Sequence, residues 1–574
     1  MPIALVDASS VADAPAHFNA VPICNNAEMT NRGVSAMHAF SRVTQYVFQA
    51  IAALLCLLSL QGCGDEAAAP TTEVDILVTG GTVFDGSGGA PITADIGIEG
   101  DRIVFIGDAT AELIAGRTTI DASGRWVAPG FIDAHSHAVL DEDYGRDAIP
   151  YLVQGITTAV LGVDGSGTSD VAERLEAWRQ RGIGTNALHY VGHGSIRRQV
   201  MGMDDREPTA DELDQMRELV VKGMEEGAFG FSTGLFYVPG AYASTDEVIE
   251  LATAAARYPG AIYDTHDRDL GAVYEGIGYD ASVAEAVRIG EESGLKVIFS
   301  HYNLQGAHNY GRGDVAARYV NEARARGVDV QAAHHPYTAT QSNLRAYTMP
   351  YWASAGGMED MVSRFDDPDT SERIANATNE MLAIRGGADK ILFADPRPEL
   401  NGKTLADVAR ERELSPALTV QSILRENNAT VMNLELYDDA NTQRLALEPW
   451  MMTCTDGRTP RPDQVITHPR TFGAFPKKMR MMVLDNALLD AEFVIRSFSG
   501  LAADFFGLTD RGYLRAGYMA DVVVLDPDSY RDTATFENPK SLAEGVEQVL
   551  VNGQFAIRDG KPTGALAGAA LERT

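Results

Sequence analysis

The histidines of this chain stand out because most of them follow short apolar segments. The chain has 574 residues and 12 histidines, and seven of these lie at the end of such a segment or just after it. The seven are His135, His137, His193, His266, His301, His334 and His335. Neutral imidazoles and carboxylates are ligands that hold Zn²⁺ in proteins. The sequence therefore predicts a metal site if the fold brings these segment ends together.

The clearest pair is His135 and His137, at the end of the run PGFIDAHSH (residues 129–137). Side chains two positions apart on a strand point to the same face, so both imidazoles can reach one ion. Taken alone, such a pair is more often two ordinary polar residues at the edge of a strand. Its interpretation therefore depends on the other segments.

Four further residues extend the predicted site. His266 and His301 follow neighbouring segments and could hold a second ion. Asp164 is placed to bridge two ions about 3.5–4 Å apart, and Asp456 would contact both the metal and the nucleophilic water. Each histidine taken singly could be a hydrogen-bonded residue in a polar rim. All four histidines together favour a metal site.

The middle of the chain predicts the fold that brings these residues together. Short apolar segments alternate there with patterns that place apolar residues at i, i+3 or i+4, which is typical of helices. The predicted strands are residues 126–132, 157–162, 187–191, 228–232, 261–264, 296–300, 328–333 and 449–453. The pattern predicts an α/β fold, a (β/α)8 TIM barrel over residues 129–499 with an inserted subdomain at about 345–448. Active sites of such barrels lie at the carboxyl ends of the strands.

The sequence pattern at both ends of the globular part differs from that of the middle. Residues 73–128 and 500–574 contain β-branched, alternating segments between glycine-rich turns. They predict strands of an antiparallel sheet, with Asn552-Gly553 as a hairpin turn. We expect one small β-sandwich domain assembled from these two segments.

Residues 1–72 are predicted to lie outside the fold. The apolar run 46–60 follows a basic residue and precedes Leu-Gln-Gly-Cys63, which resembles a bacterial lipoprotein signal. Residues 65–72 are predicted to be a tether, and a buried helix or uncleaved anchor is the alternative for 46–60. The signal predicts a location on the periplasmic side of a bacterial envelope, lipid-anchored or secreted after cleavage.

Composition excludes some partners. The formal net charge is −33, which argues against binding to nucleic acid or to an anionic membrane surface. A local cationic pocket could still bind a small carboxylate. Three of the four cysteines lie in the first 63 residues, which leaves Cys454 alone in the body of the chain, so no disulfide framework is predicted there.

The motifs resemble those of the amidohydrolase superfamily, and within it the N-acyl-D-amino-acid deacylases. The resemblance covers roughly residues 74–565. It rests on PGFIDAHSH, GITTAVLG (155–162), GHGSIRRQVMG (192–202), GAFGFSTGLFYVPG (227–240), YDTHDRD (263–269), SHYN (300–303), CTDG (454–457), HPRTFGAFP (468–476) and GLTDRGYLRAGYMADVVVLDP (507–527).

The resemblance implies roles for individual residues. His135 and His137 would bind one metal ion, and His266 and His301 the other, with one or two Zn²⁺ ions as the cofactor. Asp456 would be the metal-linked general acid and base. The residues implied to bind the substrate are Tyr237, Arg470, Asn303, Tyr337 and Ser342, with Arg470 and Tyr237 holding its carboxylate.

The chain departs from the family pattern at three positions. Asp164 stands where relatives carry the cysteine of Gly-Asn-Cys-Gly, and an aspartate binds zinc less tightly than a thiolate. Asn303 replaces the lysine of Ser-His-x-Lys, which removes a cation from the implied carboxylate site. His335 replaces the first tyrosine of Tyr-Pro-Tyr.

Three hypotheses follow. The first is a zinc-dependent hydrolase of N-acyl-D-amino acids, in which the preference for D-residues comes from the resemblance alone. The second keeps the hydrolase but changes the small-molecule substrate to a D-peptide, a cyclic amide or an amide-linked xenobiotic. The third is a non-catalytic lipoprotein that uses the barrel as a binding module, and the presence of Asp456 with all four histidines argues against it.

Overall fold

The computed structural model describes residues 72–573. The predicted signal run 46–60, Cys63 and the tether lie outside these residues, and their roles stay predictions. Within the described part, none of the helices combines the length and apolar character needed to span a bilayer.

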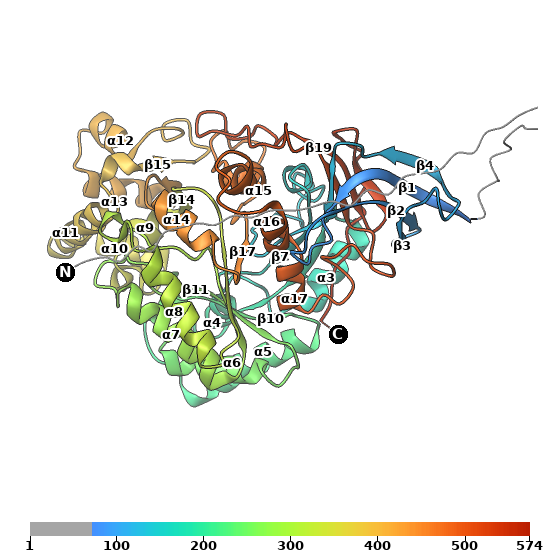
Figure 1. The fold of residues 1–574 in the computed structure, drawn as a ribbon. Helices are drawn as coiled ribbons and strands as arrows, with labels where there is room; N and C mark the ends of the chain where they lie inside the picture. The colour runs from blue at the N-terminus through green and yellow to red at the C-terminus, as the bar shows by residue number, and fades with distance from the viewer. Residues whose placement is uncertain (1–71, 574) are drawn as a thin grey trace, which may run out of the picture. The chain divides into compact units, whose positions relative to one another are not determined.

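The centre of the molecule is a closed parallel barrel, which confirms the predicted fold (Figure 1). Its strands are β6 (Phe131–Asp133), β7 (Ile156–Leu161), β8 (Asn186–His189), β9 (Val191–Gly192), β10 (Gly230–Gly234), β11 (Ile262–His266), β12 (Lys296–Phe299), β13 (Val330–His334) and β17 (Met451–Thr453). β8 and β9 are two halves of one strand on either side of Tyr190. The backbone N–H of Ala134 donates to the carbonyl of Thr453 at 3.2 Å and joins the first strand to the last.

Amphipathic helices cover the outside of the barrel (Figure 1). They include α3 (Val171–Arg181), α5 (Ala210–Glu225), α6 (Thr245–Ala255), α7 (Tyr279–Ser293), α8 (Gly313–Ala325) and α16 (Ala491–Phe498). In α5 the apolar residues Met216, Val220 and Met224 recur every four positions and are buried. Thr209 and Glu212 form a capping box at its start, which satisfies otherwise free N–H groups.

The barrel interior is a packed core. Ile132, Val160, Leu188, Ile262, Ile298, Ala333 and Met452 from the strands form one apolar cluster. Phe505 and Phe506 of α17 (Gly500–Phe506) belong to the same cluster. Residues 500–506 therefore pack with the barrel, although we predicted them within the β domain.

The small β domain is one sheet built from both ends of the described chain. Its order is β21-β20-β19-β18-β5-β1-β2-β3, with β4 paired to β1. The strands are β1 (Thr72–Val83), β2 (Ile92–Glu99), β3 (Arg102–Gly107), β4 (Ile114–Asp121), β5 (Trp126–Pro129), β18 (Val522–Leu525), β19 (Val546–Val551), β20 (Gln554–Arg558) and β21 (Lys561–Pro562). The predicted sandwich is thus a continuous nine-stranded sheet, in which β18 pairs antiparallel with β5.

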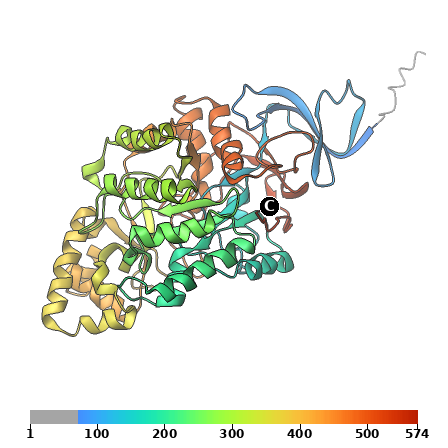
Figure 2. The ribbon, with the colours of Figure 1, turned by 90° about the horizontal axis from the view of Figure 1, so that it is seen from below.

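An inserted subdomain separates β13 from β17. It contains an antiparallel sheet of β14 (Thr340–Asn343), β15 (Ile391–Phe393) and β16 (Thr430–Asn433). Its helices are α9 (Leu344–Thr348), α10 (Met358–Arg364), α11 (Pro368–Ile384), α12 (Leu405–Glu411), α13 (Pro416–Glu426) and α14 (Asp439–Ala446). The subdomain has an apolar core of its own around Leu344, Phe393 and Val420. Figures 1 and 2 show it at the opposite end of the barrel from the β sheet.

Candidate functional site

The six predicted metal-ligating residues meet at the carboxyl ends of the barrel strands. They are His135 and His137 after β6, Asp164 after β7, His266 at the end of β11, His301 after β12 and Asp456 after β17. All are buried except His137 and Asp164, which are partly exposed to the cavity. The barrel thus brings together residues that lie up to about 320 positions apart in the sequence.

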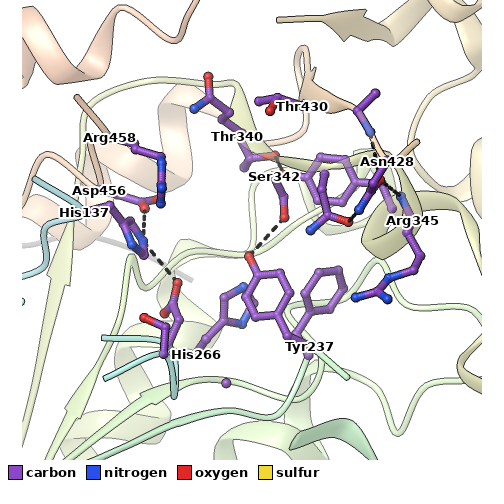
Figure 3. Close-up of a pocket in the computed structure, with 18 of the residues that line it drawn as sticks. His137, Tyr237, His266, Thr340, Ser342, Arg345, Asn428, Thr430, Asp456 and Arg458 are labelled. Carbon is purple, nitrogen blue, oxygen red and sulfur yellow. Dashed lines mark hydrogen bonds and ion pairs between the residues drawn. The ribbon is translucent and has the colours of Figure 1, made fainter. Parts of the chain in front are cut away.

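Distances between these side chains suit a shared cation. Nε2 of His137 lies 3.3 Å from Oδ2 of Asp164 and 3.4 Å from Oδ1 of Asp456 (Figure 3). Nε2 of His135 lies 3.6 Å from Asp164 and 3.7 Å from Asp456. Two ligands of one tetrahedral zinc ion, each about 2.0–2.1 Å from it, are roughly 3.3 Å apart. These separations match ligands around an ion, and those of His135 are too long for direct hydrogen bonds.

The residues form two overlapping groups that could each hold a metal ion. One is His135, His137 and Asp164, and the other is His135, His301 and Asp456. His135 belongs to both, whereas the sequence predicted two separate histidine pairs. His266 belongs to neither group, but its ring lies 4.5 Å from that of His301. Nδ1 of His266 contacts the carbonyl of Asp267 at 2.9 Å, which leaves Nε2 available as a ligand.

Unpartnered buried atoms and electrostatics also fit a cation. Both ring nitrogens of His135, Oδ1 of Asp164 and Nδ1 of His301 are buried without a hydrogen-bond partner. Burial alone would lower the pKa of His135, but the carboxylates of Asp164, Asp264 and Asp456 outweigh it and raise that pKa to about 9. Buried polar groups normally have partners, and this site favours a positive one. The residues present therefore fit a divalent metal.

The backbone at this site is held in a sparsely populated conformation. Asp164, His301 and Asp456 have φ of 56°, 31° and 47°, in the left-handed region that non-glycine residues rarely adopt. Such strain is typical of functional sites, where surrounding structure fixes it. Gly234 allows the Asp164 turn to approach, because a Cβ at Gly234 would lie 2.3 Å from the carbonyl oxygen of Asp164.

A cavity of about 770 Å³ opens onto this centre. His137, Asp164, His266, His301 and Asp456 line it from the barrel, and residues of the insertion line its other side. Tyr237 and Ser342, both predicted to bind substrate, face each other across it, and the Ser342 hydroxyl donates to the Tyr237 hydroxyl at 3.3 Å (Figure 3).

The structure does not bring Asn303 and Tyr337 to the wall of this cavity. The side-chain amide of Asn303 donates to Oγ1 of Thr442 in α14 at 2.8 Å. The ring of Tyr337 packs beneath Nζ of Lys477 in α15 (Arg470–Met479), 5.0 Å from the ring centre. Both side chains turn away from the cavity toward helices, so the described geometry does not support a direct contact with substrate.

Arg470 lies behind Asp456 and does not line the cavity. Its Nη1 is 2.5 Å from Oδ2 of Asp456 and 3.1 Å from Nε2 of His335, and the side chain is buried. Burial favours the neutral form of Asp456, but the guanidinium, together with His301, His137 and His135, outweighs burial and holds the pKa of that carboxyl well below its usual range. In this conformation Arg470 positions Asp456, and its predicted contact with the substrate carboxylate stays a prediction.

Comparison with known proteins agrees with this geometry. A family model described as the amidohydrolase family matches residues 118–557. The chain belongs to the amidohydrolase family.

The relatives that this amidohydrolase resembles include deacylases of N-acyl-D-amino acids. D-aminoacylase from Alcaligenes xylosoxydans xylosoxydans is 34% identical over 87% of this chain and 98% of its own length. A crystal structure of D-aminoacylase has a TM-score of 0.74 at 33% identity and covers 87% of this chain and 100% of that one. N-acyl-D-glutamate deacylase from Bordetella bronchiseptica, solved with zinc and a phosphonate inhibitor, has a TM-score of 0.72 at 29% identity and the same coverage.

Sequence reasoning missed one buried carboxylate of the amidohydrolase site. Asp264 accepts hydrogen bonds from the hydroxyls of Ser232 at 2.7 Å and Ser300 at 3.0 Å, and its Oδ1 lies 3.9 Å from Nδ1 of His135. Ser232 also accepts from the backbone N–H of Gly165, next to Asp164. Asp264 therefore connects three strand ends. The sequence did contain a signal for Asp264, because it lies two residues before His266 and therefore on the same face of β11.

His335 is the second residue whose place the sequence did not predict. Besides its contact with Arg470, its Nε2 lies 3.7 Å from Oδ2 of Asp456. Burial, together with the charge of Arg470, keeps the pKa of His335 well below its usual value, so the ring is neutral. A neutral imidazole can accept the guanidinium N–H, which helps to hold Arg470 against Asp456.

We expect Asp264→Asn to weaken binding of a divalent metal by about 10- to 100-fold, the usual effect of removing an outer-shell carboxylate. The change keeps the shape of the side chain but removes the charge that faces His135. Competition with a chelating dye measures the affinity. Asp314→Asn, at an exposed carboxylate on α8, is the control. Equal affinity in Asp264→Asn and the unmodified protein would contradict this role.

Proposed function

We propose that this amidohydrolase is a zinc-dependent enzyme that hydrolyses the amide bond of N-acyl-D-amino acids, releasing a carboxylate and a D-amino acid. The observation that carries the proposal is the pair of overlapping His/Asp groups, with unpartnered buried atoms, at the floor of a large cavity. The relatives support the substrate class, because they are a D-aminoacylase and an N-acyl-D-glutamate deacylase.

The residues that would hold the metal are His135, His137, Asp164, His301 and Asp456, with His266 adjacent. When bound, zinc polarises a carbonyl group and lowers the pKa of water. One ion or two fits the overlapping groups, because His135 belongs to both. A solved D-aminoacylase carries a binuclear metal centre, which supports two ions.

Asp456 is placed to move the protons of the reaction. It faces the cavity, and Arg470 keeps it ionised, so its carboxylate can accept a proton from the attacking water. The same oxygen then delivers that proton to the nitrogen of the leaving amine as the C–N bond breaks. The Tyr237 hydroxyl faces the same space, and burial raises its pKa, so it stays protonated and can donate to the developing oxyanion.

A second candidate keeps the hydrolase and changes the substrate. Asn303 faces Thr442, and Arg470 is engaged by Asp456, so two of the residues predicted to bind the substrate are absent from the cavity wall. This arrangement favours an amide whose recognition differs from that of a plain N-acyl-D-amino acid. A D-peptide, a cyclic amide or an amide-linked xenobiotic fits that description.

Metal quantification coupled to a substrate panel tests the proposal. We expect at least one zinc ion per chain, and turnover of N-acetyl-D-methionine that a chelator abolishes and zinc restores. N-acetyl-L-methionine should react at least about 100-fold more slowly, a discrimination of roughly 2.7 kcal/mol. Turnover of a hydantoin in place of both would favour the second candidate. Protein that binds no zinc and hydrolyses none of these compounds would favour a binding module and contradict the proposal.

A further inference from the structure

The wall of the cavity carries more arginines than carboxylates. Five arginines line it: Arg198, Arg345, Arg397, Arg458 and Arg461. Two of them have carboxylate partners, since Arg397 pairs with Asp395 at 2.7 Å and Arg461 with Asp463 at 3.2 Å. The other three form no ion pair within residues 72–573. Arg198 and Arg458 are exposed to solvent, whereas Arg345 is half-buried, so Arg345 is the unpaired cation that requires a reason.

Arg345 is the most constrained of the three. It is half-buried at the start of α9, where its backbone N–H donates to Oδ1 of Asn428 at 3.1 Å. Its Nε is buried and has no hydrogen-bond partner in the described structure. Figure 3 shows its guanidinium extending into the cavity, on the other side of Tyr237 from His137 and Asp456. A buried cationic donor without a partner costs free energy unless a ligand supplies one.

Arg198 lines the same cavity from a barrel helix and is exposed to solvent. It lies in α4 (His193–Met201), and its side chain has no ion-pair or hydrogen-bond partner in the described chain. Burial lowers the pKa of Arg345, Tyr242 opposes this shift, and the charge of Arg198 adds to it, so the two guanidinium groups repel each other. No nearby carboxylate relieves this repulsion: of the carboxylates lining the cavity, Asp164 and Asp456 belong to the metal site and Asp395 pairs with Arg397.

We propose that Arg198 and Arg345 form an anion-binding subsite for a substrate carboxylate that lies away from the scissile amide. The inference deepens the proposed function and rests on it, because it names the kind of N-acyl substrate that this cavity takes. A guanidinium binds a carboxylate through two parallel N–H donors, and two guanidinium groups that line one cavity can hold one carboxylate between them.

The place of the subsite selects the substrate class. Arg345 lies on the other side of Tyr237 from His137 and Asp456, so a carboxylate that it binds is separated from the reacting carbonyl by several bonds (Figure 3). Such a carboxylate has two chemical sources. It is either the acidic side chain of an N-acyl-D-amino acid, or the terminal carboxylate of an N-acyl-D-dipeptide. In both, a remote anion takes over part of the recognition that Arg470 does not provide in this conformation.

Matched acid and amide substrates test the subsite. The first arm compares N-acetyl-D-glutamate with N-acetyl-D-glutamine, and the second compares N-acetyl-D-alanyl-D-alanine with its C-terminal amide. We expect the unmodified enzyme to prefer the acid in at least one arm. Arg345→Gln should lower that preference in kcat/KM by about 10- to 100-fold, mostly through KM, with the amide substrate unchanged. Arg198→Gln should act in the same direction, and Arg345→Lys should recover part of the preference.

Arg461→Gln is the matched control, because Arg461 lines the same cavity but already has Asp463 as a partner. It should retain the preference. An acid-to-amide ratio that stays the same in Arg345→Gln, in both arms, would overturn the proposal. If the enzyme hydrolyses none of the four compounds, calorimetry of the zinc-loaded protein tests the subsite separately, and the proposed function fails only if N-acetyl-D-methionine is not hydrolysed either. Tighter binding of an acid than of its amide, lost in Arg345→Gln, supports the subsite, and equal binding overturns it.

Discussion

Asp456→Asn is expected to lower amide turnover by about 10²–10⁴-fold while the protein keeps its metal, because it removes the group that accepts and returns the proton. The amide has nearly the same shape, and its single oxygen can take the place of Oδ1, which faces His137, or of Oδ2, which accepts from Arg470. It cannot take a proton from water at neutral pH. Steady-state kinetics on the N-acetyl-D-substrate that the unmodified enzyme hydrolyses fastest, combined with metal analysis of the same sample, measures both parts of this expectation.

A matched control separates this loss from a general effect of charge. Asp463→Asn removes an exposed carboxylate near the cavity that pairs with Arg461, and its turnover should stay within about 3-fold of the unmodified enzyme. Turnover of Asp456→Asn close to that of the control would show that another group moves the proton. His335 would then be the next residue to replace, because its neutral ring has Nε2 at 3.7 Å from Oδ2 of Asp456.

Asp164→Asn should reduce zinc affinity by at least about 10-fold, with the largest loss in any second ion. Asp164 is the only carboxylate that lies within 4.0 Å of His135, His137 and His301 among the described residues. Burial favours its neutral form, but His135, His137 and His266 outweigh burial and hold its pKa far below the usual range. It is therefore ionised and ready to bind a cation. Asparagine keeps the left-handed backbone that this position needs but loses the charge.

Asp164→Cys should change zinc affinity in the opposite direction from Asp164→Asn, since a thiolate binds zinc more tightly than a carboxylate does. We expect it to raise the preference for zinc over manganese relative to the unmodified protein, although the positive φ at this position disfavours cysteine. Metal stoichiometry after dialysis against buffered zinc, and competition with manganese, provide the measurements. Asp143→Asn, at an exposed carboxylate, is the control. Unchanged zinc affinity in Asp164→Asn would exclude Asp164 as a ligand.

Much of the fold could be predicted because the barrel strands are short apolar runs at regular intervals, and each of the eight predicted strands is present. Two features of the fold could not be predicted, because they depend on contacts between residues that are distant in the sequence. The run 126–132 is uniformly apolar, yet it divides at Gly130 into β5 and β6, because β5 pairs with β1 and β18 of the β domain whereas β6 pairs with β7 of the barrel. Similarly, residues 500–506 carry apolar side chains that either domain could bury, and only the structure places them beneath the barrel.

At the site, residue type and strand position predicted which residues meet, but not which way each side chain points. His301 and Asn303 are two positions apart, yet the turn after β12 directs the first to the cavity and the second to Thr442. The contact between Arg470 and Asp456 joins the start of α15 to the end of β17, and no local pattern records it. Asp264 could have been predicted from its spacing to His266, but the unpaired arginines required the full set of ion pairs.

The antiparallel pairing of β5 with β18 has a consequence for how the protein is made. The paired residues Trp126 and Leu525 are about 400 positions apart, which gives this contact a very high sequence separation. During synthesis, β1 to β5 emerge long before β18, and the exposed edge of β5 can meanwhile pair with another unfinished chain. Completion of the sheet therefore waits until β18 and the strands that follow it have been synthesised. The nascent chain needs protection at this edge until residues 522–558 are available to close it.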